Sequence, residues 1–233
     1  MTLFALRLVA AGLSAALLAS GAAAQLPAPA AAPPDVLMRS VTTEVLAILK
    51  QDAAAGQPTD VARLVESKIL PLFDFEHMTR IAAARHWWAA SAEQQAALVT
   101  QFRTLLVRTY SSALSSYRDE GVEYKPLRLA SGETDVLVKS VVRRPGAEPL
   151  TIDYDMERTP AGWKVYDVKI AGVSMVLTYR ETFAAAVRSS GINGLIKSLT
   201  DKNRQNPAGP PKAQGAELAP VLMLYSGGSR SRL

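Results

Sequence analysis

The chain has no cysteine and only two histidines among its 233 residues. The lack of cysteine excludes disulfides, cysteine-bound metals and cysteine nucleophiles. Neither His77 nor His86 lies at metal-ligand spacing from a second candidate ligand. The sequence also has no nucleophile-elbow pattern and no glycine-rich phosphate loop after a strand. We therefore expect no metal, no cofactor and no catalytic residue.

A strong excess of one charge is also missing from the central part of the chain. The formal net charge is +5, but several of the basic residues lie near the two ends, at Arg7, Arg204, Lys212, Arg230 and Arg232. The part between the ends is close to neutral. A broad phosphate-binding stripe is therefore not implied, and we expect no nucleic-acid partner.

Residues 1–24 have the pattern of a secretory signal peptide. Arg7 gives a positive start, residues 8–18 form a short apolar run, and alanines at 22–24 favour cleavage after Ala24. The apolar run is too short to span a membrane. Without a cysteine at the cleavage point, no lipoprotein anchor can form there. We expect a soluble exported protein, in a bacterial periplasm or outside the cell.

Composition divides the remaining chain into three parts. Residues 25–34 are rich in alanine and proline, which is typical of a linker. Residues 203–233 are rich in proline, glycine and serine, and we expect a disordered tail there. Residues 35–202 have the size of one domain.

Helix signals dominate the first half of this domain. Asp35 is predicted to cap a helix over residues 36–51, in which Val41 and Val45 share an apolar face. Three more helices are expected: from Thr59 or Asp60 to Pro71, over residues 75–85 after a cap at Asp74, and from a Ser91–Gln94 capping box to about residue 118.

Strand signals follow, over residues 122–129, 135–144, 150–156 and 163–170. The alternation in the last strand slips, which predicts a bulge near Tyr166 or Asp167. A break at Ala171–Gly172 is expected to lead into a helix from Ser174 that stops at Gly191, with a short helix after it. The order predicts an α+β fold. Its helices would pack on one face of a curled, cone-like antiparallel sheet of four strands, enclosing an apolar cavity.

The residues alone leave two interpretations of the apolar strand faces open. They can fill an ordinary core, or they can line a cavity. The carboxylates Asp153, Asp155 and Glu157 alternate with apolar residues on one strand, so they form a solvated face or, if buried, an acid–base pair. The arginines of the helical region, among them Arg80 and Arg103, form a solvated helix face or a surface that docks acidic partners.

Several segments resemble one known family. GWKVYDV at 162–168, GVSMV at 172–176 and GINGLI at 191–196 resemble the MlaC family of periplasmic phospholipid carriers, also known as toluene-tolerance auxiliary proteins of an ABC transport system. Residues 69–114 resemble the family's central helical block, which has a Leu-Pro pair, an aromatic pair before a Ser/Thr capping box, and a Phe-Arg pair. Here these are Leu70-Pro71, Trp87-Trp88, Ser91 and Phe102-Arg103.

The resemblance implies a function and a site. The protein would shuttle a glycerophospholipid between an outer-membrane lipoprotein–porin complex and an inner-membrane ABC transporter with its membrane-anchored substrate-binding subunit, which maintains outer-membrane lipid asymmetry. The alternatives are an enzyme of a cone-shaped α+β fold that acts on an apolar small molecule, and an adaptor that carries nothing. The expected acyl-chain contacts are apolar and aromatic residues of the helices and strands: Phe75, Met78, Phe102, Leu105, Tyr110, Val136, Val138, Ile152, Tyr154, Met156, Val168 and Met175.

Overall fold

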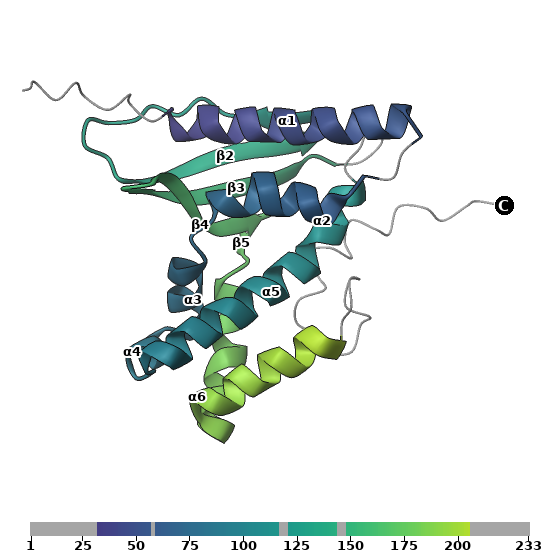
Figure 1. Ribbon diagram of the computed structural model, residues 1–233. Helices are drawn as coiled ribbons and strands as arrows, with labels where there is room; N and C mark the ends of the chain where they lie inside the picture. The colour runs from purple at the N-terminus through teal and green to yellow at the C-terminus, as the bar shows by residue number, and fades with distance from the viewer. Residues whose placement is uncertain (1–31, 57–58, 117–120, 144–147, 206–233) are drawn as a thin grey trace, which may run out of the picture. The chain divides into compact units, whose positions relative to one another are not determined.

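The computed structural model describes residues 32–56, 59–116, 121–143 and 148–205 (Figure 1). The predicted signal peptide, most of the linker and all but the start of the tail lie outside these residues. The helices are α1 (Pro34–Ala54), α2 (Val61–Leu64), the π-helix η1 (Val65–Ile69), the 3₁₀ turn η2 (Leu70–Leu72), α3 (Phe75–Ala83), α4 (Arg85–Trp88), α5 (Ala92–Ser116), the 3₁₀ turn η3 (Leu177–Tyr179) and α6 (Arg180–Gln205). Within these ranges, every helix is too short or too polar to cross a membrane.

The strands form one antiparallel sheet in the order β1-β2-β3-β4-β5. They are β1 (Gly121–Tyr124), β2 (Asp135–Arg143), β3 (Leu150–Thr159), β4 (Gly162–Ile170) and β5 (Val173–Ser174). The α+β class is confirmed, but the sheet has five strands and not four. The expected helix start at Ser174 is also wrong, because Val173 and Ser174 form the fifth strand. Ala171 and Gly172 have positive φ angles of 50° and 81°, so the chain turns back as a two-residue hairpin and pairs with β4.

The predicted bulge is confirmed at Tyr166. Asp155 of β3 lies opposite Asp167, and the next residue, Met156, lies opposite Val165, so Tyr166 has no partner in the register. The extra residue restores the apolar face, because Val165 before it and Val168 after it are both buried on the same side. A bulge of this kind increases the local twist of a sheet.

Local capping signals fix the starts of α2, α3 and α5. The carboxylates of Asp60 and Asp74 accept hydrogen bonds from the N–H groups of Arg63 and His77, as predicted. The Ser91–Gln94 capping box is also formed. The prediction for Asp35 is wrong, because Pro33 occupies the N-cap position and Asp35 lies in the first turn.

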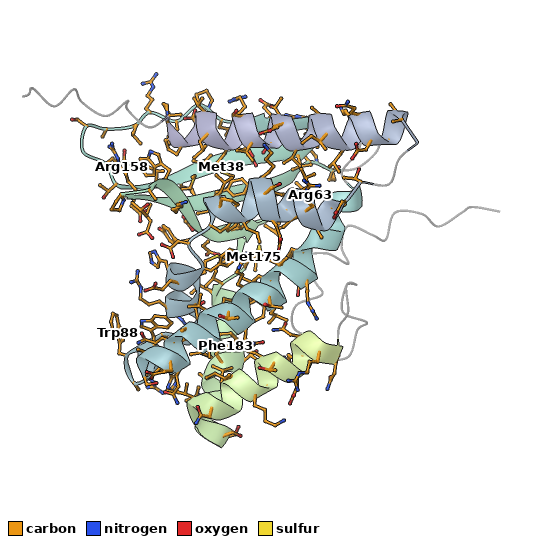
Figure 2. All side chains as sticks on the ribbon, in the orientation of Figure 1. Met38, Arg63, Trp88, Arg158, Met175 and Phe183 are labelled. Carbon is orange, nitrogen blue, oxygen red and sulfur yellow. The ribbon has the colours of Figure 1, made fainter. Side chains whose placement is uncertain are left out.

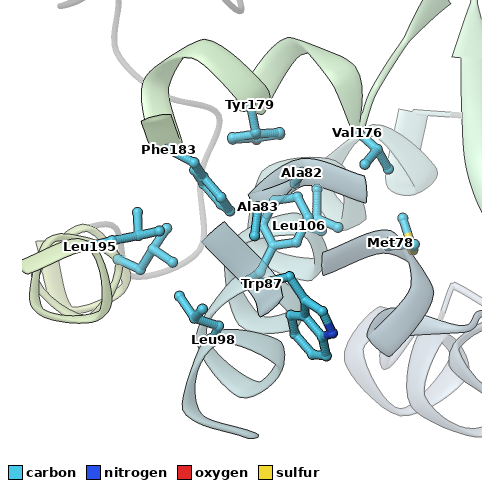
Figure 3. Packing of buried hydrophobic residues seen from close by; sticks show 12 residues of the cluster. Met78, Ala82, Ala83, Trp87, Leu98, Leu106, Val176, Tyr179, Phe183 and Leu195 are labelled. Carbon is cyan, nitrogen blue, oxygen red and sulfur yellow. The ribbon is translucent and has the colours of Figure 1, made fainter. Parts of the chain in front are cut away.

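Buried apolar residues gather in three clusters. The sheet–α1 cluster contains Met38, Val138, Met156 and Val165, and α1 runs along the sheet (Figure 1). The helical cluster joins α3, α4, α5, η3 and α6 (Figure 3). A small third cluster joins α1 to α2. The space where the three clusters approach one another is not filled by side chains.

Candidate functional site: an apolar cavity between sheet and helices

A cavity of about 280 Å³ lies between α1, the segment from η1 to α3, α5 and the sheet. This volume is close to the lower end of the range for ligand pockets, about 300–1,000 Å³. The lining residues come from every one of these elements: Met38, Val41, Thr42, Val45, Leu46, Leu49, Val65, Ile69, Leu70, Leu72, Phe73, Phe75, Met78, Leu106, Val107, Tyr110, Val122, Tyr124, Val142, Ile152, Tyr154, Val168, Ile170 and Met175. Among these described residues none is charged.

Helical and strand periodicity explain how the walls are built. On α1 the lining residues recur at intervals of three and four, as in Met38, Val41, Val45 and Leu49, which is the apolar stripe of an amphipathic helix. On the sheet they recur at intervals of two, because alternate side chains face the same side. Met38 and Met175 lie on different walls (Figure 2). The wall is therefore assembled from segments far apart in the chain.

Three of the four polar side chains in the wall form a row of hydroxyls. The hydroxyls of Thr42 and Tyr124 are 2.6 Å apart, and Tyr124 is also hydrogen bonded to Tyr154. The two tyrosine rings stack with their centroids 6.3 Å apart. Burial raises the pKa of Tyr124 above its ordinary value, while these hydrogen bonds and the positive charge of Arg39 act in the opposite direction.

The fourth polar side chain, Tyr110, lies on α5. Its hydroxyl is hydrogen bonded to that of Tyr179, which is buried in the helical cluster. Burial raises the pKa of both phenols. The cavity therefore holds neutral hydroxyls and no carboxylate or imidazole in its described wall.

The structure brings seven of the twelve predicted contact residues together in the cavity wall: Phe75, Met78, Tyr110, Ile152, Tyr154, Val168 and Met175. It places the other five elsewhere. Phe102 and Leu105 pack in the helical cluster, while Val136, Val138 and Met156 pack in the sheet–α1 cluster. These five belong to buried faces that meet another apolar element instead of the open space. Contact between the seven and a lipid stays a prediction.

Sequence reasoning missed most of α1. The interval between Val41 and Val45 predicted an apolar helix face, and both residues line the cavity. However, nothing in the local pattern indicated what this face would contact. Tyr124 was also missed, because only its strand had a signal, and its hydroxyl partner Thr42 is 82 positions away.

Several titratable groups outside the cavity, His77 and Asp155 among them, have structural partners. His77 Nδ1 lies 2.5 Å from Glu157 Oε1 and its ring stacks on Tyr166. Asp155 is paired with Lys169. In the ranges that the structure describes, no three histidine or acidic side chains gather closely enough to hold a metal ion.

Comparisons with known proteins agree with one another. The family model described as MlaC protein matches residues 39–201. Toluene tolerance protein ttg2D of Pseudomonas putida is 26% identical over 173 residues, which are 73% of this chain and 80% of that protein. The intermembrane phospholipid transport system binding protein MlaC of Haemophilus influenzae is 21% identical over 177 residues, 74% of this chain and 83% of that protein.

A solved structure extends the comparison to the fold. It is the phospholipid-binding protein from Ralstonia solanacearum in complex with a phospholipid, and it is 40% identical in sequence with a TM-score of 0.66. The match covers 73% of this chain and 97% of that chain. The family match spans most of the chain, and the solved relative is similar to it in both sequence and fold. This chain therefore belongs to the MlaC protein family.

Proposed function

We propose that the protein binds a glycerophospholipid with its acyl chains in the cavity and carries it through the periplasm. The observation that carries this proposal is the cavity itself, whose described wall holds apolar side chains and four neutral hydroxyls. The relatives' names, which describe phospholipid binding and intermembrane phospholipid transport, support the same ligand class.

The energetics explain why a lipid needs such a protein in water. Exposing an acyl chain of about 16 carbons costs on the order of 12 kcal/mol, at ~0.8 kcal/mol for each CH₂ group. An apolar cavity removes most of this cost. We propose that the lipid is exchanged at both ends of its path, with an outer-membrane lipoprotein–porin complex and with an inner-membrane ABC transporter, and that this exchange maintains outer-membrane asymmetry.

Two other functions fit less well. An enzyme acting on an apolar molecule needs a general acid and base at the reacting group, and the described wall offers only tyrosine and threonine hydroxyls. An adaptor that carries nothing would gain no benefit from an open cavity, because unfilled apolar space lowers stability.

The test begins with the mature protein purified without detergent. Its bound lipid is extracted and analysed by mass spectrometry. The delipidated protein is then incubated with phospholipid vesicles, separated from them and analysed again. We expect lipid in both samples, and transfer from donor to acceptor vesicles that increases with protein concentration. Protein that is free of lipid in both samples would rule out the proposal.

A further inference from the structure

The hydroxyl row of Thr42, Tyr124 and Tyr154 is unusual in a wall that is otherwise apolar. A buried hydroxyl is costly unless it is hydrogen bonded. Phenylalanine and valine would fill the same space without needing any hydrogen-bond partner. The row is held from three elements, α1, β1 and β3, and Tyr124 is only 3% exposed, so its position is fixed by packing.

A positive charge lies against the same row. Arg39, one turn before Thr42 on α1, is exposed and donates a hydrogen bond of 2.9 Å to the backbone carbonyl of Tyr124. Its guanidinium carbon lies 5.7 Å from the centroid of the Tyr124 ring. No carboxylate in the described ranges forms an ion pair with Arg39. The row therefore has apolar lining beside it in the cavity and a cation next to it that is open to solvent.

The order of groups in a glycerophospholipid matches this order of side chains. Each acyl chain ends in an ester carbonyl, which only accepts hydrogen bonds, and the phosphate anion follows on the glycerol. A hydroxyl is both a donor and an acceptor and can rotate to donate to a new oxygen. Guanidinium groups suit the geometry of phosphate.

We propose that the hydroxyl row binds the ester linkage of the lipid while Arg39 binds its phosphate. This inference rests on the proposed function and deepens it, because it states which groups of the lipid the side chains recognise. The acyl chains extend from the row along the apolar wall. The row then sets how deeply the lipid sits, and the cavity prefers ester-linked diacyl phospholipids to other amphiphiles of the same length.

A change of one linkage in the ligand tests the row. The probes are vesicles of dipalmitoyl phosphatidylglycerol and of its dihexadecyl ether analogue, which has the same headgroup but lacks the ester carbonyls. Delipidated protein is offered both lipids in equal amounts, and the ratio bound is measured by mass spectrometry. We expect the wild type to prefer the ester about three- to tenfold, as one neutral hydrogen bond allows.

Substitutions in the hydroxyl row test whether the row causes this preference for the ester. Tyr124→Phe and Thr42→Val should bring the ratio close to one while both lipids still bind. Tyr166→Phe is the matched control, since it removes a tyrosine hydroxyl that bonds to Asp135 outside the cavity, and it should keep the wild-type ratio. A purely structural role of the row would lower the melting temperature without changing the ratio. Using two row variants keeps the test decisive if one of them fails to fold.

The phosphate contact is tested separately with dipalmitoyl glycerol, which has the same esters and no phosphate. Wild type should prefer the phospholipid. Arg39→Gln should reduce this preference several-fold and Arg39→Lys should retain part of it. An equal ratio of ester to ether in the wild type, or an unchanged ratio in Tyr124→Phe, would overturn the inference and leave the carrier function intact. If the wild type binds neither lipid, the carrier function itself fails.

Discussion

The ring of Phe102 on α5 packs edge-on against the ring of Phe183 on α6, with centroids 5.1 Å apart and planes at 71°. Phe102 makes a similar contact with Tyr179 at 4.9 Å. Three aromatic rings from α5, η3 and α6 therefore form the centre of the helical cluster, where Figure 3 shows Tyr179 and Phe183 among the other buried side chains. This places Phe102 in the packed interior and not in the cavity wall.

We expect Phe102→Ala to lower the free energy of unfolding by ~3–5 kcal/mol, because it removes a fully buried ring from this cluster. Urea denaturation monitored by circular dichroism measures the change. The amount of lipid per folded protein should stay at the wild-type level under conditions where the variant is folded. A selective loss of lipid with unchanged stability would show that Phe102 contacts the ligand.

Val138 and Ile152 lie on the same face of neighbouring strands but have different surroundings. Val138 is fully buried in the sheet–α1 cluster, whereas Ile152 is only partly buried and lines the cavity. We expect Val138→Trp to destabilise the fold by ~1–3 kcal/mol or more, since the added volume has no space to occupy. Ile152→Trp should keep a melting temperature near that of the wild type.

The same pair should show opposite effects on cargo. The indole of Ile152→Trp would occupy space that the acyl chains need, so bound phospholipid should fall. The fraction of Val138→Trp that is still folded should hold lipid normally. Melting temperature and lipid per protein are measured together. The assignment of Ile152 to the wall fails if its variant keeps the full lipid content.

The buried carboxylate of Asp167 accepts hydrogen bonds from the Ser174 hydroxyl and from the N–H groups of Val168 and Val176. Burial raises the pKa of this carboxyl above 3.8, although the three hydrogen bonds act in the opposite direction. The folded state then binds more protons than the unfolded state as the pH passes through this range. We predict that the contribution of Asp167 to stability is greatest below pH 3.8 and decreases as the pH rises through the folded-state pKa.

Two substitutions isolate this effect. Asp167→Asn keeps one oxygen for the two N–H groups, and its amide can donate to the Ser174 hydroxyl, so it should fold and remove this part of the pH dependence. Asp167→Ala leaves the N–H groups without an acceptor and should cost ~1–3 kcal/mol. Urea denaturation at a series of pH values measures both. The pH prediction is refuted by an Asn variant with the wild-type pH dependence.

The end of α6 should decide where the chain can be truncated. The side-chain amide of Asn203 donates to the Gln101 backbone carbonyl and side-chain oxygen at 2.9 and 3.0 Å, and Arg108 donates to the backbone carbonyl of Asn203. The helix ends at Gln205, beyond the predicted boundary at Lys202. We expect truncation after Gln205 to preserve melting temperature and lipid content.

Truncation after Lys202 is the matched comparison. It removes Asn203 and its three hydrogen bonds to α5, so the melting temperature should fall. Differential scanning calorimetry compares both truncated forms with the full chain. Equal melting temperatures for the two forms would show that Asn203 does not anchor α6. A large loss in both would mean that residues 206–233 stabilise the domain.

Gly191 allows α6 to change direction. Its φ and ψ angles of 67° and −176° are accessible to glycine and strongly unfavourable for other residues. We expect Gly191→Ala to lower stability by ~1–3 kcal/mol. Gly121→Ala is the control, because no atom lies within 4 Å of the added methyl group and φ is not positive there. Equal stability of the two variants in urea would contradict this explanation of the kink.

The sequence alone determined the features that depend on neighbouring residues. The caps at Asp60 and Asp74 form within three residues of the carboxylate. The bulge at Tyr166 follows from the slip in alternation along one strand. The short motifs around residues 162–196 were sufficient to identify the family. A prediction from the local sequence fails where pairing with another strand competes with it. This happens at Ser174, where a hairpin takes the place of the expected helix start.

Only the tertiary structure decided which apolar faces are packed and which line open space. Val138 and Ile152 follow the same strand pattern, yet one is covered by packed side chains and the other borders the cavity. The hydroxyl row likewise joins Thr42 to Tyr124, 82 positions apart. The physical reason is that periodicity fixes the direction of a side chain relative to its own backbone. The distance to the element opposite is set by the packing of the whole domain, and that distance determines whether a core or a cavity forms.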